Sequence, residues 1–210
     1  GEAALAHLKQ RGIYQSIRRE LEAEHYRIRP LPAGGAPVGQ AAYQADNHAQ
    51  QLRADFAPDG LRLSPRQESQ GEWQSRMKLI GYGYGAQILP ASAARLTAAG
   101  NRIEIHHQFP TPDSQPPIVE WYVNTAAGLE HGIDLPAPPG VKTGQEPLRV
   151  ALALEGELRA EAVEGGQALE FTDQAGQRVL RYDHLVVRDG GGRELAARMA
   201  LGMDGSEVWL

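Results

Sequence analysis

The chain has 210 residues, a formal net charge of −5 and 41% hydrophobic residues, which suits one large domain or two small ones. Cysteine is absent, and this excludes a disulfide framework, thiolate metal ligands and a cysteine nucleophile. The negative charge argues against nucleic acid as a partner. The arginines are spread along the chain and form no basic stripe. No apolar run is long enough for a transmembrane helix, so no membrane span is predicted.

Residues 2–24 show the spacing of an amphipathic helix. After Gly12, the residues Ile13, Ile17 and Leu21 recur at every fourth position, and charged residues occupy the other faces. A first strand and a loop rich in Pro and Gly follow, so residues 1–40 are predicted to form an N-terminal segment of helix, strand and linker. We interpret the helix as a lid over one end of a sheet, with docking onto a partner as the alternative.

From residue 41 onward the sequence alternates apolar and polar residues as β-strands do. Turns built on Asp and Gly separate the strands, among them Asp59 with Gly60, Asp173 with Gly176, and Asp189 with its following glycines. This pattern predicts an all-β fold, an antiparallel β-sandwich-like meander with one N-terminal amphipathic α-helix. Residues 41–210 form either one continuous β-rich domain or two lobes divided within the Pro/Gly-rich stretch 136–147.

Residues 118–135 form the unit around which we expect the chain to be organised. Ile118, Glu120 and Tyr122 fall on one face of a strand, and the intervening residues fall on the other. A turn of small residues leads into a second short run, and Pro-rich loops bound the unit on both sides. The pattern predicts two consecutive strands.

Glu104 and His106 are the candidate metal ligands. They lie two residues apart, so on a strand they point to one side while His107 points to the other. A third donor is needed, and Glu120 or His131 could supply it. The spacing lacks the His-Glu-x-x-His pattern of zinc hydrolases, and a solvent-facing strand explains the pair as well.

Tyr82, Tyr84 and Trp121 are the candidate ligand platform. In the run Gly81-Tyr-Gly-Tyr-Gly85 both tyrosines share one face, and flat aromatic rings of this kind can stack against a sugar. The alternative is that the tyrosines fill the core or its rim, while the glycines admit a close-packed neighbour. The glycines match no nucleotide-binding spacing.

Two runs of sequence resemble a known family. They are WYVNTAAGLEHG at 121–132 and LRYDHLVVRDGGGRELAAR at 180–198. Both are similar to the β-rich region near the N-terminus of large secreted bacterial proteins, ahead of FG-GAP (integrin-α-like) or related β-propeller repeats. The resemblance covers the chain from Tyr43 onward, although the sequence stops at Leu210, before the Ile-Asp-Pro motif of that family. It implies an extracellular or cell-surface location after removal of a targeting segment, and a scaffolding or adhesive role without catalytic residues.

Three functions fit the sequence, and they are ranked by how well they fit it. The first is a non-catalytic structural or adhesive domain of an exported bacterial surface or matrix protein, which contacts other proteins or copies of itself. The second is a carbohydrate-binding module that uses Tyr82, Tyr84 or Trp121 to bind glycans. The third is a metal-dependent hydrolase. No cofactor is predicted, and the final run 206–210 reads as the middle of a strand, so we expect the gene product to continue.

Overall fold

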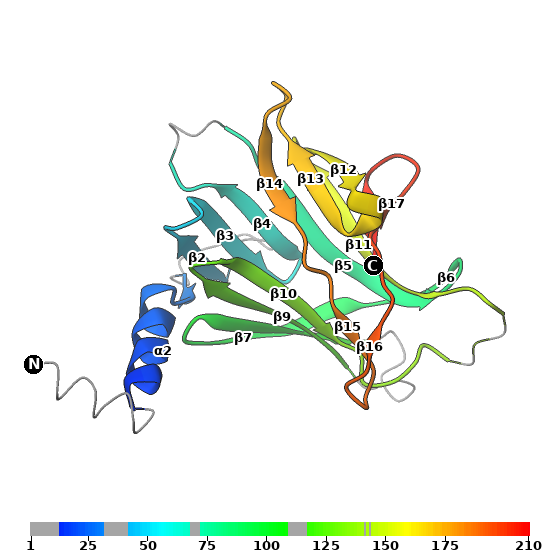
Figure 1. Ribbon diagram of the computed structural model, residues 1–210, viewed down its shortest axis with the longest axis horizontal. Helices are drawn as coiled ribbons and strands as arrows, with labels where there is room; N and C mark the ends of the chain where they lie inside the picture. Colours follow the sequence, from blue (N-terminus) through cyan, green and yellow to red (C-terminus); the bar gives the residue numbers. More distant parts are fainter. Residues whose placement is uncertain (1–12, 32–41, 68–71, 109–116, 141, 143) are drawn as a thin grey trace, which may run out of the picture.

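The computed structural model describes residues 13–31, 42–67, 72–108, 117–140, 142 and 144–210. Strands make up 57% of the structure and helix 6%, and the strands form several antiparallel sheets (Figure 1). The prediction of a mostly β, antiparallel fold is confirmed. Within these ranges, no helix has the length and apolar character that crossing a membrane requires.

The largest sheet has nine strands in the order β1-β2-β3-β4-β5-β11-β18-β17, with β6 beside β5. Its strands are β1 (Arg29–Pro30), β2 (Tyr43–Asn47), β3 (Leu52–Ala57), β4 (Gly60–Pro65), β5 (Ser75–Tyr84), β6 (Gln87–Pro90), β11 (Leu148–Gly156), β17 (Ala200–Leu201) and β18 (Glu207–Trp209). Because β11 pairs with β5, the stretch 136–147 connects strands of one shared sheet.

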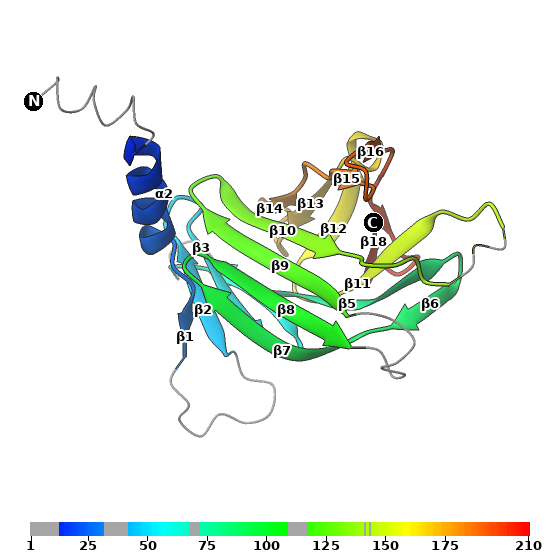
Figure 2. The ribbon, with the colours of Figure 1, turned by 90° about the horizontal axis from the view of Figure 1, so that it is seen from below.

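A four-stranded sheet contains the central unit of the sequence. Its order is β10-β9-β8-β7, built from β7 (Ser92–Ala99), β8 (Arg102–Gln108), β9 (Ile118–Thr125) and β10 (Gly128–Asp134). Burial alternates along β9, with Ile118, Glu120, Tyr122 and Asn124 facing inward, as the sequence predicts. Figure 2 shows this sheet in front of the first strands of the nine-stranded sheet.

The last third of the chain forms two smaller elements. A three-stranded sheet contains β12 (Arg159–Val163), β13 (Ala168–Thr172) and β14 (Arg178–Tyr182), with the short 3-10 helix η2 (Glu164–Gly166) between its first two strands. A hairpin of β15 (Val187–Arg188) and β16 (Glu194–Leu195) follows. The turn between β13 and β14 and the turn between β15 and β16 are stabilised in the same way. The Asp173 carboxylate accepts two backbone N–H groups of the first turn, and the Asp189 carboxylate accepts two of the second. The predicted Asp-Gly turns are confirmed.

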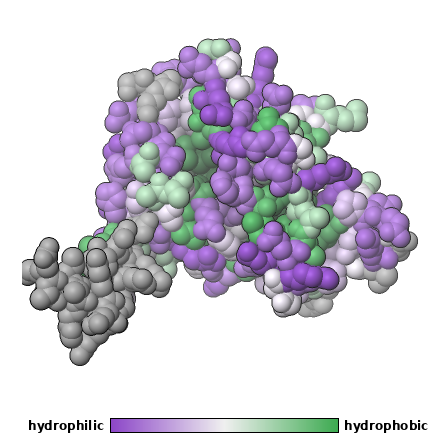
Figure 3. Space-filling view, in the orientation of Figure 1, coloured by the Kyte–Doolittle hydropathy of each residue, from purple (hydrophilic) through white to green (hydrophobic). Residues whose placement is uncertain are grey.

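Two apolar cores hold the sheets together, and β9 contributes to both. One core joins β2, β3 and β4 to the four-stranded sheet, and its buried members are Ile28, Ala45, Ala54, Phe56, Leu61, Ile103, Ile105 and Tyr122. The other joins β5, β11 and β18 to the three-stranded sheet, and its buried members are Leu79, Tyr82, Ile118, Val150, Leu152, Leu169, Phe171, Met199 and Val208. Each large apolar side chain buried in these cores stabilises the fold by about 1.5–3 kcal/mol. On the face shown in Figure 3, hydrophobic residues gather toward the middle and hydrophilic residues form most of the rim.

The helix α2 (Ile13–His25) lies at one end of the sheets (Figure 1). The earlier part of the predicted helix, and the linker from residue 32 to 41, lie outside the described residues. Leu21 is 66% exposed and Ile17 is 43% exposed, so this part of the apolar stripe does not cover the described sheets. The chain enters the core just after the helix, where Tyr26 and Ile28 are buried.

The glycines of the run 81–85 have a packing role. A side chain at Gly81 would place its Cβ 2.0 Å from the carbonyl oxygen of Leu89, and one at Gly83 would lie 1.8 Å from that of Gln87. Both acceptors belong to β6, which pairs with this end of β5. The interpretation that these glycines admit a close-packed neighbour is confirmed.

Candidate functional site

The predicted metal pair lies on the outer face of the four-stranded sheet. Glu104 Oε2 is 3.6 Å from His106 Nε2, and Glu104 Oε1 accepts a hydrogen bond of 3.0 Å from Arg102. The predicted third donors, Glu120 and His131, have buried side chains on the inner face, so the sheet separates them from the pair. The expectation that they join it is wrong, because each strand turns alternate residues to opposite faces. Among the described residues, no group of three His, Asp or Glu side chains could hold a metal ion.

The three predicted platform residues do not share one surface. Tyr82 is completely buried and donates its hydroxyl to the carbonyl of Ala137 at 3.2 Å, so its ring is not available to stack a sugar. Burial also raises the pKa of Tyr82. Tyr84 is half-buried on the nine-stranded sheet, while Trp121 lies on the outer face of the four-stranded sheet. Glycan binding at Tyr84 or Trp121 stays a prediction.

The Trp121 ring fills space above a glycine. Gly132 of β10 is the cross-strand partner of Trp121, and a Cβ at position 132 would lie 2.0 Å from the indole. The Arg102 guanidinium stacks over the same ring, 4.5 Å from the centroid. An aromatic side chain that shields a cross-strand glycine supports the pairing of strands. Trp121, the first residue of the run 121–132, therefore packs within the sheet between Gly132 and Arg102.

A buried polar group forms where the inner face of the four-stranded sheet meets the three-stranded sheet. We call it the Glu120 cluster, and its members are His107, Glu120, Tyr122, His131 and Tyr182. The side chains of Glu120, His107 and His131 are at most 5% exposed. Four strands supply the five residues, β8, β9, β10 and the end of β14.

The Glu120 carboxylate is the centre of this cluster. Its Oε2 lies 2.6 Å from His107 Nε2, and its Oε1 accepts the Tyr122 hydroxyl at 2.6 Å. His131 Nε2 lies 3.2 Å from Oε1, within ion-pair distance but not aligned for a hydrogen bond. A carboxylate only accepts hydrogen bonds when ionised, so His107 carries a proton on Nε2.

His131 extends the cluster to the three-stranded sheet. Its Nδ1 lies 3.0 Å from the hydroxyl of Tyr182, and its ring stacks on Tyr122 with centroids 4.4 Å apart. If Tyr182 donates to Nδ1, the remaining imidazole proton on Nε2 faces the carboxylate of Glu120. In this arrangement the hydroxyl proton of Tyr182 and the imidazole proton of His131 both point in the direction of the negatively charged Glu120.

The ionisation states follow from burial and from the charge of Glu120. Burial alone would raise the pKa of Glu120, but the hydrogen bond from His107 and the electrostatic attraction of His107 and His131 outweigh it and hold that pKa well below 4.5. Burial, then the negative charge of Glu120, raises the pKa of Tyr122 and that of Tyr182. Glu120 is therefore ionised at neutral pH, and both tyrosines are neutral donors.

The order Tyr182–His131–Glu120 is that of a hydroxyl, an imidazole and a carboxylate in a proton relay. An activated hydroxyl would need a lowered pKa, whereas that of Tyr182 is raised. The arrangement is suited to joining two sheets through a buried charge. The sequence places Glu120 on the same strand face as Ile118 and Tyr122, and His107 on the same face as Ile103 and Ile105. That His107 and Glu120 lie side by side follows only from the register between β8 and β9, which the sequence pattern does not give.

In comparisons with known proteins, no family model matches the chain, and no curated protein or solved structure matches it at a significant level. The resemblance to the region ahead of FG-GAP repeats therefore rests on the two runs of sequence alone.

Proposed function

We propose that this chain is a non-catalytic structural domain, with a sandwich-like body and an N-terminal helix, that contacts other copies of itself through β7, one of the two outer strands of its four-stranded sheet. The observation that carries the proposal is β7, an eight-residue strand whose described pairing is with β8 alone. An edge strand leaves alternate N–H and C=O groups without partners, and these groups template the addition of another strand.

The edges of the nine-stranded sheet differ from β7 in a way that supports this choice. Both outer strands, β1 and β17, are two residues long, and β1 contains Pro30. Short strands and proline protect an edge against pairing. In β7 the only charged residue is Arg95, and Thr97 and Ala99 are small and exposed. The register shift between Ala93 and Arg95 bends the start of β7 and leaves its second half regular.

Sedimentation velocity over a range of protein concentrations tests this function. We expect reversible dimers that disappear in Thr97→Lys, because a charge on an edge strand opposes pairing. Val119→Lys is the matched control, since it places the same charge on the outer face of the central strand β9 and leaves the β7 edge unchanged. A monomer at every concentration, or equal effects of the two variants, would contradict the proposal.

We further propose that the domain belongs to an exported bacterial surface or matrix protein. The resemblance of residues 121–132 and 180–198 to the region ahead of FG-GAP repeats supports this placement. Cell fractionation of the source organism, combined with the intact mass of the native polypeptide, tests it. Recovery of the protein only inside the cell would contradict it.

A further inference from the structure

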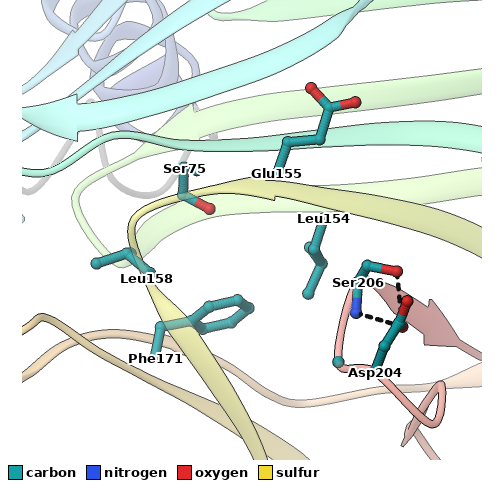
Figure 4. A pocket seen from close by; sticks show the side chains of 9 residues that line it. Ser75, Leu154, Glu155, Leu158, Phe171, Asp204 and Ser206 are labelled. Carbon is teal, nitrogen blue, oxygen red and sulfur yellow. Dashed lines mark hydrogen bonds between the residues drawn. The ribbon is translucent and has the colours of Figure 1, made fainter.

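A hollow of about 200 Å³ lies where the nine-stranded sheet meets the three-stranded sheet. Its apolar wall consists of Leu154 from the end of β11, Leu158 from the following corner, and Phe171 from β13 (Figure 4). The turn between β17 and β18 closes another side with Asp204 and Ser206. The hollow thus combines apolar walls with a polar side.

Ser75 places an unused hydroxyl at this hollow. The residue is only 8% exposed, and no described residue forms a hydrogen bond with its Oγ. Figure 4 shows the hydroxyl directed toward the space between Leu158 and Leu154. Buried hydroxyls normally have a partner, so this group is available to a ligand.

Asp204 supplies an ionised carboxylate that its own turn holds in place. Its Oδ1 accepts the Ser206 N–H at 3.0 Å and the Ser206 hydroxyl at 2.7 Å. These hydrogen bonds lower the pKa of Asp204. The second oxygen, Oδ2, has no hydrogen bond to a described residue.

The charge of Asp204 is not balanced within the hollow. The other carboxylate of the lining, Glu155, forms an ion pair of 3.0 Å with Arg76 and extends away from the hollow in Figure 4. No Lys, Arg or His is among the described lining residues. Met203, the neighbour of Asp204 in the turn, is fully exposed.

We propose that this hollow binds a lysine side chain of a partner protein. The four methylene groups of lysine pack against Leu154, Leu158 and Phe171, because a lysine stem is apolar. The ammonium group is compact and has three donors, and the Asp204 carboxylate and the Ser75 hydroxyl are acceptors that line this hollow. The site rests on residues other than β7, and it extends the proposed contact function to a partner with an exposed lysine.

The test uses small probes and the full chain of 210 residues. We expect Nα-acetyl-lysine methylamide to give saturable amide shifts at Gly156, Gly205 and Ser206 in ¹H–¹⁵N spectra. The neutral isostere Nα-acetyl-norleucine methylamide should bind about tenfold more weakly, since it lacks the charged contact. Asp204→Asn should remove this preference while keeping the turn, because the Asn side-chain oxygen still accepts the Ser206 N–H.

Two further variants distinguish an effect on the lysine site from a general effect of changing an Asp turn. Asp189→Asn alters an equivalent turn in the β15–β16 hairpin and should leave lysine binding unchanged. Ser75→Ala should weaken binding of the lysine probe and leave the norleucine probe unaffected. Equal binding of both probes, or no saturable shift with lysine, would overturn the proposal. Since the probes are monomeric ligands, failure of self-association through β7 would not produce either result.

Discussion

Strand β9 carries two buried polar side chains four residues apart, Glu120 and Asn124, which differ in charge and in how completely they are hydrogen-bonded. Asn124 is 1% exposed and donates to the backbone carbonyls of Tyr26 and Asp46 at 3.1 and 3.2 Å. Its Oδ1 accepts from Asn47 at 2.8 Å. Every side-chain hydrogen-bonding atom of Asn124 is therefore used, and the joint between β2, β9 and the end of the helix carries no charge.

The Glu120 cluster carries a charge and is incompletely bonded. His107 Nδ1 and His131 Nε2 are buried without a hydrogen-bond partner among the described residues. Two buried polar joints on one strand can thus be equally inaccessible and still differ in their response to pH. No titratable side chain takes part in the hydrogen bonds of Asn124, whereas the charged joint depends on the ionised state of Glu120.

Glu120→Ala should have the largest effect on stability. It removes the only negative charge of the cluster and leaves His107 and Tyr122 buried without their acceptor. Loss of one partner from a buried ionic group costs about 3–5 kcal/mol. Urea unfolding measures the free energy, and Glu104→Ala on the outer face is the matched control, with an expected loss below about 1 kcal/mol. Similar losses in the two variants would show that Glu120 is not the centre of the cluster.

Asn124→Ala should destabilise the protein by about 2–3 kcal/mol, because buried carbonyl groups lose their donors. The expected loss is the same at pH 7 and at pH 4, since no ionised group takes part. The same urea experiment at both pH values provides the check. Gln50→Ala, which removes exposed hydrogen bonds to the neighbouring turn, should change stability by less than about 0.5 kcal/mol. A strong dependence of the Asn124→Ala effect on pH would break the comparison.

Glu120→Gln should separate charge from shape. Because the pKa of Glu120 is lowered in the folded state, its contribution is present above pH 4.5 and is lost as the pH falls below that value. The free energy of unfolding of the wild type should therefore fall toward that of Glu120→Gln in acid, by up to about 1.4 kcal/mol per pH unit. Urea midpoints between pH 7 and acid pH measure the difference. A constant difference across this range would mean that Glu120 titrates alike in both states.

Tyr182→Phe should have the smallest effect, a loss of about 1 kcal/mol from the missing hydrogen bond to His131. The pKa of Tyr182 is raised in the folded state, so its contribution is present below pH 10 and is lost as the pH rises above that value. The variant should therefore lose less stability than the wild type between pH 9 and pH 11, a range of about one unit on either side of the unfolded value. Tyr84→Phe, on the nine-stranded sheet, serves as the control and should follow the wild type.

The sequence predicts features that depend on neighbouring residues. The alternation of β9 identifies Ile118, Glu120 and Tyr122 as one face, and the structure buries that face. The turns at Asp173 and Asp189 also follow from local chemistry, because an Asp side chain bonds to amides of its own turn. These features need no knowledge of which strands lie side by side.

The candidate site depends on contacts that local patterns do not specify. His107 and Glu120 meet because β8 and β9 pair with His107 opposite Ile118, and this register is set by the whole sheet. Tyr182 comes from a strand fifty-one residues beyond His131 and reaches it only after the sheets pack. The sequence leaves Tyr82 open between a ligand platform and the core, and the apolar core around β5, β11 and β18 buries it completely. Alternation separates the faces of a strand but does not say what covers each face.

The most direct test of an ionised Glu120 between the sheets is the side-chain ¹³C chemical shift of its carboxyl group as a function of pH. We expect the shift of an ionised carboxylate to persist as the pH falls through 4.5, while the protein remains folded. Glu104, on the outer face, provides an internal reference in the same spectra. A Glu120 carboxyl group that takes up its proton at or above pH 4.5 in the folded protein would contradict the buried charge that we place between the sheets.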